Sequence, residues 1–101
     1  MCKQMHEQLS RTVVVRGRQG LHARPADLFV RLASRYQAQV EIQKGAERVD
    51  GKSILNVLTL AAEQGCPLVI VATGPDAAAA LQALAELVES NFGEPEPEAT
   101  S

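Results

Sequence analysis

The sequence predicts a small α/β protein in which helices cover one side of a mixed or antiparallel sheet. Strand-like and helix-like segments follow one another in the order β-α-β-β-α-β-α along a chain of 101 residues. The segment 38–45 alternates apolar and polar residues, as is typical of a strand with one face in water. A hydrophobic content of 46% with 22% charged residues is that of a globular protein. Together these observations favour a two-layer sandwich.

The first strand and the first helix follow from their patterns. The β-branched run in "SRTVVVRG", residues 10–17, predicts a strand bounded by Gly17 and Gly20. A helix is expected over 23–36, because apolar side chains recur there at helical spacing. Its apolar face is formed by Ala26, Phe29, Ala33 and Tyr36.

The middle of the chain predicts two strands and a second helix. A short turn joins the strand 38–45 to "ERVD", residues 47–50. The stretch "GKSILNVLTLAAEQG", residues 51–65, predicts a helix with Ser53 as its N-cap and Gly65 past its end. Its expected core stripe is formed by Ile54, Val57, Leu58 and Ala61.

The last strand and helix are the most regular. "PLVIVAT", residues 67–73, is a continuous apolar run of strand length. The final helix is expected to begin at Asp76 as its cap and to close at Gly93. Its buried stripe is formed by Ala77, Leu81, Leu84 and Val88.

One domain accounts for most of the chain. We expect it to span residues 9–93, after a polar N-terminal segment 1–8. The final stretch "EPEPEATS", residues 94–101, is rich in proline and glutamate and has little to bury. It is therefore expected to be a disordered acidic tail.

Composition excludes several classes of function. A net charge of −2 gives no electrostatic reason to expect nucleic acid as a partner. No apolar run has the length of a membrane span, and the N-terminus lacks the apolar core of a signal peptide, so we expect a cytoplasmic protein without membrane insertion. Cys2 and Cys66 have no CxxC partner or metal-ligand cluster, so no metal site and no cofactor are expected. Two free thiols fit a reducing compartment.

His22 is the residue that most needs an explanation, since it stands where the first helix begins. Backbone N–H groups at a helix start, together with Arg24, could receive the oxygens of a phosphoryl group carried on the ring. Pro25 suits the first turn of a helix, and Gly20 allows a tight turn before it. On residue type alone, a histidine here is more often a capping or surface residue. Both interpretations are open at this point.

Two motifs at this spacing resemble those of the HPr family, the histidine-containing phosphocarriers of the bacterial phosphoenolpyruvate-dependent phosphotransferase system. They are "GLHARPA", residues 20–26, and "GKSILNVLTLAAEQG", residues 51–65. The likeness runs from about Leu9 to Phe92. It implies an open-faced β-sandwich, with a four-stranded antiparallel sheet in the order 1-4-2-3 and three helices on one face.

The resemblance also implies roles for single residues. His22 would accept a phosphoryl group on its Nδ1 from phosphorylated enzyme I and pass it to enzyme IIA domains. Arg24 matches the arginine that contacts the phosphohistidine, with Gly20, Ala23 and Pro25 as supporting residues of the motif. Ser53 matches the serine that an HPr kinase/phosphorylase modifies in some bacteria. An N-cap role is by itself sufficient to explain a serine there.

A partner-docking surface is implied beside the histidine. The family positions that match Ile54, Leu55 and Leu58 form a partly exposed apolar patch, and Asp27 and Arg31 are expected at its rim. Three residues depart from the common family pattern: Gln19, Asp27 and Glu47. Together they could shift partner choice away from the standard sugar-transport enzymes.

The function expected is therefore that of a monomeric phosphocarrier, not of an enzyme, because it depends on partner enzymes for catalysis. No nucleophile–base pair or phosphate-binding glycine loop accompanies His22. The alternative is a regulatory module of the same fold, of the nitrogen or catabolite-repression type. Such a module would act on transcription factors or enzymes through a form modified at Ser53.

Overall fold

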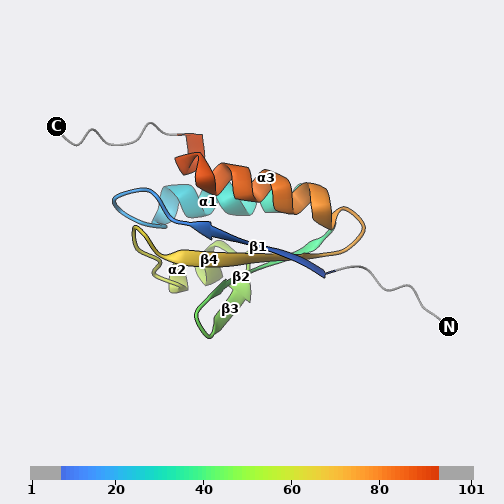
Figure 1. Ribbon diagram of the computed structural model, residues 1–101, viewed down its shortest axis with the longest axis horizontal. Coiled ribbons are helices and arrows are strands. Elements are labelled where there is room, and N and C mark those ends of the chain that lie inside the picture. Colours follow the sequence, from blue (N-terminus) through green and yellow to red (C-terminus); the bar gives the residue numbers. More distant parts are fainter. Residues whose placement is uncertain (1–7, 94–101) are drawn as a thin grey trace.

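The computed structural model describes residues 8–93, which form one four-stranded sheet with its helices (Figure 1). The strands are β1 (Gln8–Val14), β2 (Gln39–Lys44), β3 (Glu47–Asp50) and β4 (Pro67–Thr73). The helices are α1 (Ala23–Ala33), α2 (Ile54–Thr59) and α3 (Ala77–Glu89), and the 3₁₀ turn η1 (Asn91–Gly93) follows α3. The expected order β-α-β-β-α-β-α is confirmed.

The sheet is antiparallel throughout, with the strand order β1-β4-β2-β3. This confirms the order 1-4-2-3 that the resemblance implied. The register places Val13 opposite Leu68 and Ile42 opposite Ile70. These four side chains are almost fully buried, because they point to the same face of the sheet. That face is the one the helices cover.

A single core lies between the sheet and the three helices. Phe29 on α1, Leu60 at the end of α2 and Leu84 on α3 are each at most 1% exposed and belong to the same cluster of buried side chains. α3 packs on β1 and β4 and contacts α1, while α2 packs against α1 and β3. Most side chains of this cluster are aliphatic, and Phe29 and Phe92 are its aromatic members.

The strands match their predicted ranges closely, with one shift. β3 and β4 have the predicted bounds, whereas β1 begins at Gln8 and ends at Val14 instead of spanning 10–17. The reason is pairing, because β1 stays in register with β4 as far as Gln8 opposite Thr73. α1 begins as predicted and ends three residues early, where residues 34–36 continue as a turn.

The predicted helix over 51–65 is wrong in length. α2 has only six residues, and Ala61 lies past its end with a left-handed backbone at φ 49°. Ala61 is exposed and takes no part in the predicted core stripe, whereas Leu60 is buried. Lys44 stabilises this early end, because its Nζ donates to the carbonyl oxygens of Leu60 at 2.8 Å and Ala61 at 3.5 Å.

Asp76 begins α3 by position but does not cap it. Its carboxylate oxygens instead accept hydrogen bonds from the backbone N–H groups of Gln37 at 2.9 Å and Ala38 at 2.7 Å, just before β2. The hydrogen bond from Gln37 is the main cause that holds the pKa of Asp76 below its ordinary value of 3.8. Asp76 therefore fastens the end of the α1–β2 connection to the start of α3.

The predicted end of α3 at Gly93 is also wrong, since the helix stops at Glu89 and η1 follows. Its predicted stripe is confirmed, because Ala77, Leu81, Leu84 and Val88 are all buried. Within residues 8–93, none of the helices has both the length and the apolar character needed to cross a bilayer. The predicted tail 94–101, most of the predicted segment 1–8 and Cys2 lie outside the described residues.

Replacing Asp76 by asparagine should flatten the dependence of stability on pH in acid. Because folding lowers the pKa of Asp76 below 3.8, its contribution is complete above that pH and is lost as the pH falls through the folded-state value. Asp76→Asn should therefore lower the melting temperature at pH 7, and the difference from the unmodified protein should shrink below pH 4.

Thermal unfolding followed by circular dichroism between pH 2 and pH 7 would measure this. Glu47→Gln, at an exposed carboxylate on the β2–β3 hairpin, is the matched control. A difference between Asp76→Asn and the unmodified protein that is the same at every pH would contradict the role given to the carboxylate.

Candidate functional site

His22 is the N-cap residue of α1, and its ring is exposed. Its backbone is extended at φ −84° and ψ −167°, and its carbonyl accepts the first bond of the helix from the Ala26 N–H at 3.0 Å. The side chain makes no capping bond to the helix. His22 is therefore the N-cap by position only, since its side chain does not cap the helix. The ring is left accessible at the start of α1, as for a surface residue.

The backbone on either side of His22 is anchored by burial and by hydrogen bonds. Leu21 and Pro25 are buried, and Leu21 is only 5% exposed. The Leu21 N–H donates to the carbonyl of Ala62 at 2.9 Å, and the Gly20 N–H closes a turn on the carbonyl of Gly17 at 2.9 Å. The exposed ring consequently projects from an anchored backbone.

Two loops are joined at this end of the sheet, one over residues 15–22 and the other over 60–66. The Val15 N–H donates to Cys66 and the Gly65 N–H donates back to Val15, at 3.0 and 2.8 Å. The side-chain amide of Gln64 donates to the carbonyl of Arg16 at 3.0 Å. With the bond from Leu21 to Ala62, these contacts make the second loop the support of the first.

Gly20 is required by this contact. Its backbone is left-handed at φ 70°, and a Cβ atom there would lie 2.2 Å from the carbonyl oxygen of Ala62 and 2.9 Å from the Cα of Glu63. No side chain fits without separating the two loops. The sequence indicated a tight turn at Gly20 but not the close approach of a second loop.

Ala62 and Lys44 are site residues that the sequence analysis missed. The predicted helix over 51–65 includes Ala62, and in a helix its carbonyl would point along the helix axis. Lys44 bonds the carbonyl oxygens of Leu60 and Ala61, directly before Ala62. A helix stop between residues 59 and 62 has no glycine or proline to signal it.

The remaining residues of the first motif take the places expected of them. Ala23, Arg24 and Pro25 form the first turn of α1. Backbone N–H groups in the first turn of a helix have no acceptor within the helix. Pro25 has no N–H to satisfy and is buried, while Ala23 and Arg24 are exposed. The positive end of the α1 dipole therefore lies at His22.

Ser53 caps α2, as predicted. Its Oγ accepts a hydrogen bond from the Asn56 N–H at 3.3 Å, and its backbone is extended. The turn before it is well held, because the Lys52 N–H donates to Asp50 Oδ1 at 2.9 Å and Lys52 Nζ donates to the carbonyl of Tyr36 at 2.7 Å. The Ser53 side chain is half-buried.

The proposed docking residues lie on two helices in contact with each other, α1 and α2. Leu55 is 72% exposed, whereas Ile54 and Leu58 are half-buried. Figure 1 places α2 at the same end of the sheet as the loop that leads into α1. An exposed leucine on a short helix, beside the start of α1, is a feature that packing does not explain.

Asp27 and Arg31 are brought together by the structure, one helical turn apart. Arg31 Nε lies 2.8 Å from Asp27 Oδ2, with exposed side chains on both. Such an exposed pair contributes about 0.3–0.5 kcal/mol to stability. Gln19 and Glu47 are exposed as well.

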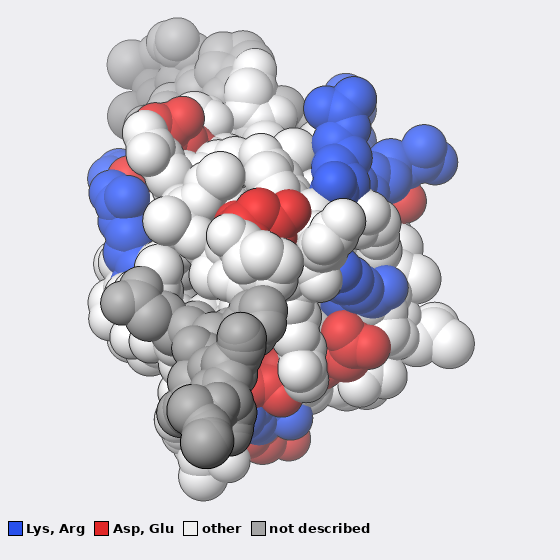
Figure 2. Space-filling model, turned by 90° about the vertical axis from the view of Figure 1, so that its right-hand side faces the viewer, with Lys and Arg blue, Asp and Glu red and all other residues white. Residues whose placement is uncertain are grey.

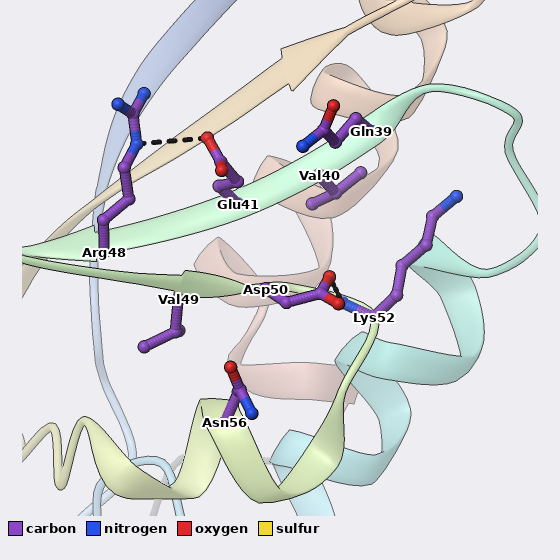
Figure 3. A pocket seen from close by; sticks show the side chains of 8 residues that line it. All are labelled: Gln39, Val40, Glu41, Arg48, Val49, Asp50, Lys52 and Asn56. Carbon is purple, nitrogen blue, oxygen red and sulfur yellow. Dashed lines mark hydrogen bonds and ion pairs between the residues drawn. The ribbon is translucent and has the colours of Figure 1, made fainter.

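A cavity of about 410 Å³ lies between the β2–β3 hairpin and the first turn of α2 (Figure 3). Its charged side chains are engaged with protein partners. Arg48 Nε is 3.1 Å from Glu41 Oε1, Asp50 accepts from the Lys52 backbone, and Lys52 Nζ is bonded to Tyr36. The cavity is therefore not the candidate site.

Two further features concern the charge distribution on the surface and the arrangement of metal-ligating side chains. On the face shown in Figure 2, basic and acidic side chains are interspersed, without one large basic field. Within residues 8–93 no three His, Cys, Asp or Glu side chains gather as they would around a metal ion. Cys66 is a free, half-buried thiol.

Gly20→Ala should destabilise the fold more than the same change at a glycine of like backbone. Gly45 has φ 57°, and a Cβ there would meet nothing within 4 Å. Gly45→Ala should cost about 1 kcal/mol for the left-handed backbone alone. Gly20→Ala should cost about 1–3 kcal/mol more, because the methyl group collides with Ala62 and Glu63.

Urea unfolding gives the two free energies, and hydrogen exchange of the Leu21 amide reports the contact itself. Protection of Leu21 should fall in Gly20→Ala and stay unchanged in Gly45→Ala. Equal effects of the two substitutions would mean that the backbone conformation, and not the contact between the loops, explains Gly20.

Comparison with known proteins is consistent with this site. A family model described as "PTS HPr component phosphorylation site" matches residues 9–90. The phosphocarrier protein HPr of Treponema pallidum is 43% identical over 84 residues, which are 83% of this chain and 96% of that protein. The HPr-like protein Crh of Bacillus subtilis is 40% identical over 77 residues, 76% of this chain and 91% of that protein.

Comparison of the fold with solved structures also indicates similarity to HPr proteins. A crystal structure of HPr-C-His from Thermoanaerobacter tengcongensis superposes with a TM-score of 0.83 at 39% identity, covering 86% of this chain and 98% of that one. Sequence and fold agree over nearly the whole described part of the chain. The protein belongs to the HPr family, the phosphocarriers of the phosphotransferase system.

Proposed function

We propose that His22 is the residue that carries the phosphoryl group. The observation that supports this most directly is an exposed ring, without a capping bond, at the N-cap of α1 on a backbone anchored by buried neighbours. The carrier domain proposed is residues 9–93, acting as a monomer in the cytoplasm. Phosphorylated enzyme I is the proposed donor, and enzyme IIA domains are the proposed acceptors.

The transfer step needs little from this chain beyond placing the acceptor. Nδ1 of His22 attacks the phosphorus atom, a P–N bond forms, and the bond to the donor breaks with its electron pair staying on the donor. The reverse sequence passes the group to the next partner. Each partner must reach the ring, which explains why the site is exposed and not in a cavity.

The start of α1 and Arg24 would hold the group without trapping it. Charge at a helix terminus contributes about 0.3–1 kcal/mol, and up to about 2 kcal/mol in favourable geometry. A guanidinium adds a charge-assisted hydrogen bond with directional preference. Interactions of this size orient the phosphoryl group but leave it able to move on.

Docking of partners is proposed at the patch of Leu55, Ile54 and Leu58, with the Asp27–Arg31 pair at its rim. The exposed leucine supplies apolar contact area, and the half-buried residues beside it continue that surface. Because the two rim charges neutralise each other, the patch has less net positive charge than Arg31 alone would give it. Partner choice would then depend on shape and apolar contact more than on charge.

Incubation with phosphoenolpyruvate and a competent enzyme I should place a single acid-labile, base-stable phosphate on the protein. His22→Ala should abolish the label. Arg24→Gln should slow labelling by about tenfold or more, since a charge-assisted contact contributes about 1.5–3 kcal/mol. Mass spectrometry after alkaline quenching would measure the label.

His6→Ala is the control, because it removes the second histidine of the chain and should leave labelling unchanged. If the unmodified protein stays unlabelled while another HPr is labelled by the same enzyme I, the proposal is wrong. Labelling that survives in His22→Ala would assign the phosphate to another residue.

A second candidate function is regulation through Ser53, favoured by its placement and by the likeness to Crh. A phosphate on Ser53 would add a charge of about −2 beside Leu55 and at the start of α2, where backbone N–H groups can receive it. An HPr kinase/phosphorylase is the proposed modifying enzyme. The regulated partner would be a transcription factor or an enzyme.

Ser53→Ala should lower the unfolding free energy by about 1 kcal/mol, because the cap is lost, while Ser53→Thr should keep most of it. Ser53→Asp should retain the cap and change partner binding. Pull-down with Ser53→Asp, with and without His22→Ala, separates the two functions. A partner that requires the acidic form and ignores His22→Ala supports regulation, whereas loss of every partner with His22→Ala contradicts it.

A further inference from the structure

A groove lies on the outer side of the α1–α3 pair and shares one residue, Arg31, with the rim of the docking patch proposed above. It is lined by Leu28, Arg31 and Leu32 of α1, by Arg35 just after that helix, and by Leu87 of α3. The cavity is about 390 Å³, and the three leucines are half-buried against the core. Figure 1 shows the two helices side by side on this side of the sheet.

The two arginines give the groove a basic side. Arg31 is 75% exposed and uses Nε for Asp27, which leaves the rest of its guanidinium fork for a second carboxylate. Arg35 is exposed, and within residues 8–93 it forms no ion pair. An occupant that fits must combine apolar surface with carboxylates.

The chain itself contains such a segment at a short distance from the groove. Residues 94–101, "EPEPEATS", alternate glutamate with proline and have no basic residue. Leu87 lies in the last turn of α3, and only Ser90 and η1 separate that helix from the segment. We propose that the segment 94–101 binds along this groove, with its prolines on the leucines and its glutamates on Arg31 and Arg35.

Length and tethering both permit this. From Leu28 to Arg35 the groove follows α1 for roughly 10 Å, and five extended residues span about 16 Å. A tether of a few residues holds the segment at an effective concentration in the millimolar range, so weak contacts are sufficient for occupancy. Residues before proline favour extended backbone, which reduces the entropy lost on binding.

A spin label on the segment would test the proposal in the full-length chain. The labelled chain carries Ala99→Cys, with Cys2→Ser and Cys66→Ala to remove the native thiols. Amide signals of Leu28, Leu32 and Leu87 should lose at least about half their intensity relative to the reduced label, given the tethered concentration. The amide of Gly45, on the β2–β3 hairpin, should be unaffected. The loss should weaken in 1 M salt, where screening acts within about 3 Å.

Charge reversal gives the matched comparison. Arg31→Glu/Arg35→Glu should restore the signals of the leucines, and Arg16→Glu/Arg18→Glu, which changes the net charge equally at exposed sites, should not. In the Arg31→Glu/Arg35→Glu variant, replacing Glu94, Glu96 and Glu98 by lysine should bring back the loss of the leucine amide signals.

Two outcomes would overturn the proposal. Signal loss that spreads evenly over the surface, or that ignores charge reversal, would mean that the segment does not bind in this groove. The spin-labelled chain can also be mixed with a chain that carries no spin label and whose amide signals are observed. Signal loss in the observed chain that grows with concentration would assign the groove to a second copy.

Discussion

The hydrogen bond from the Leu21 N–H to the carbonyl of Ala62 is the contact on which the site depends. It joins the residue before His22 to a loop that comes forty residues later in the chain. Gly20 permits it, because a Cβ atom there would lie only 2.2 Å from the Ala62 oxygen. The early end of α2 provides it, because only a loop at this position can turn a carbonyl toward Leu21. The exposed histidine is therefore held by backbone contacts and not by contacts of its own ring.

The sequence was a good guide wherever a single element determines the outcome. The start of α1 follows from Pro25 and the apolar spacing after it, and β4 follows from a continuous apolar run. The cap at Ser53 was predicted for the same reason. The end of α2 could not be predicted from the sequence, because Ala61 adopts a left-handed backbone that alanine disfavours by about 1–2 kcal/mol. Tertiary contacts outweigh that cost, with Lys44 on the preceding carbonyls and Leu60 in the core.

Asp76 shows the same limit at the other end of the sheet. An aspartate before a helix is normally interpreted as a cap, and the position is correct. Its carboxylate is used instead by Gln37 and Ala38, which precede β2 and are distant in sequence. Side chains that satisfy backbone groups across elements cannot be recognised from local pattern. They are also the contacts that hold α1, β2 and α3 in a fixed relation, and so set where the start of α1 lies.

The use of Ser53 as a cap has a consequence for its proposed modification. Phosphorylation keeps an oxygen on Cβ, so an acceptor for the Asn56 N–H is retained and the short helix need not unwind. What changes is charge, by about −2, next to the exposed Leu55. If regulation operated by reshaping the domain, the cap would be the wrong residue to modify. Its position favours a switch that leaves the fold intact and acts on partners that approach α2 with negative charge of their own.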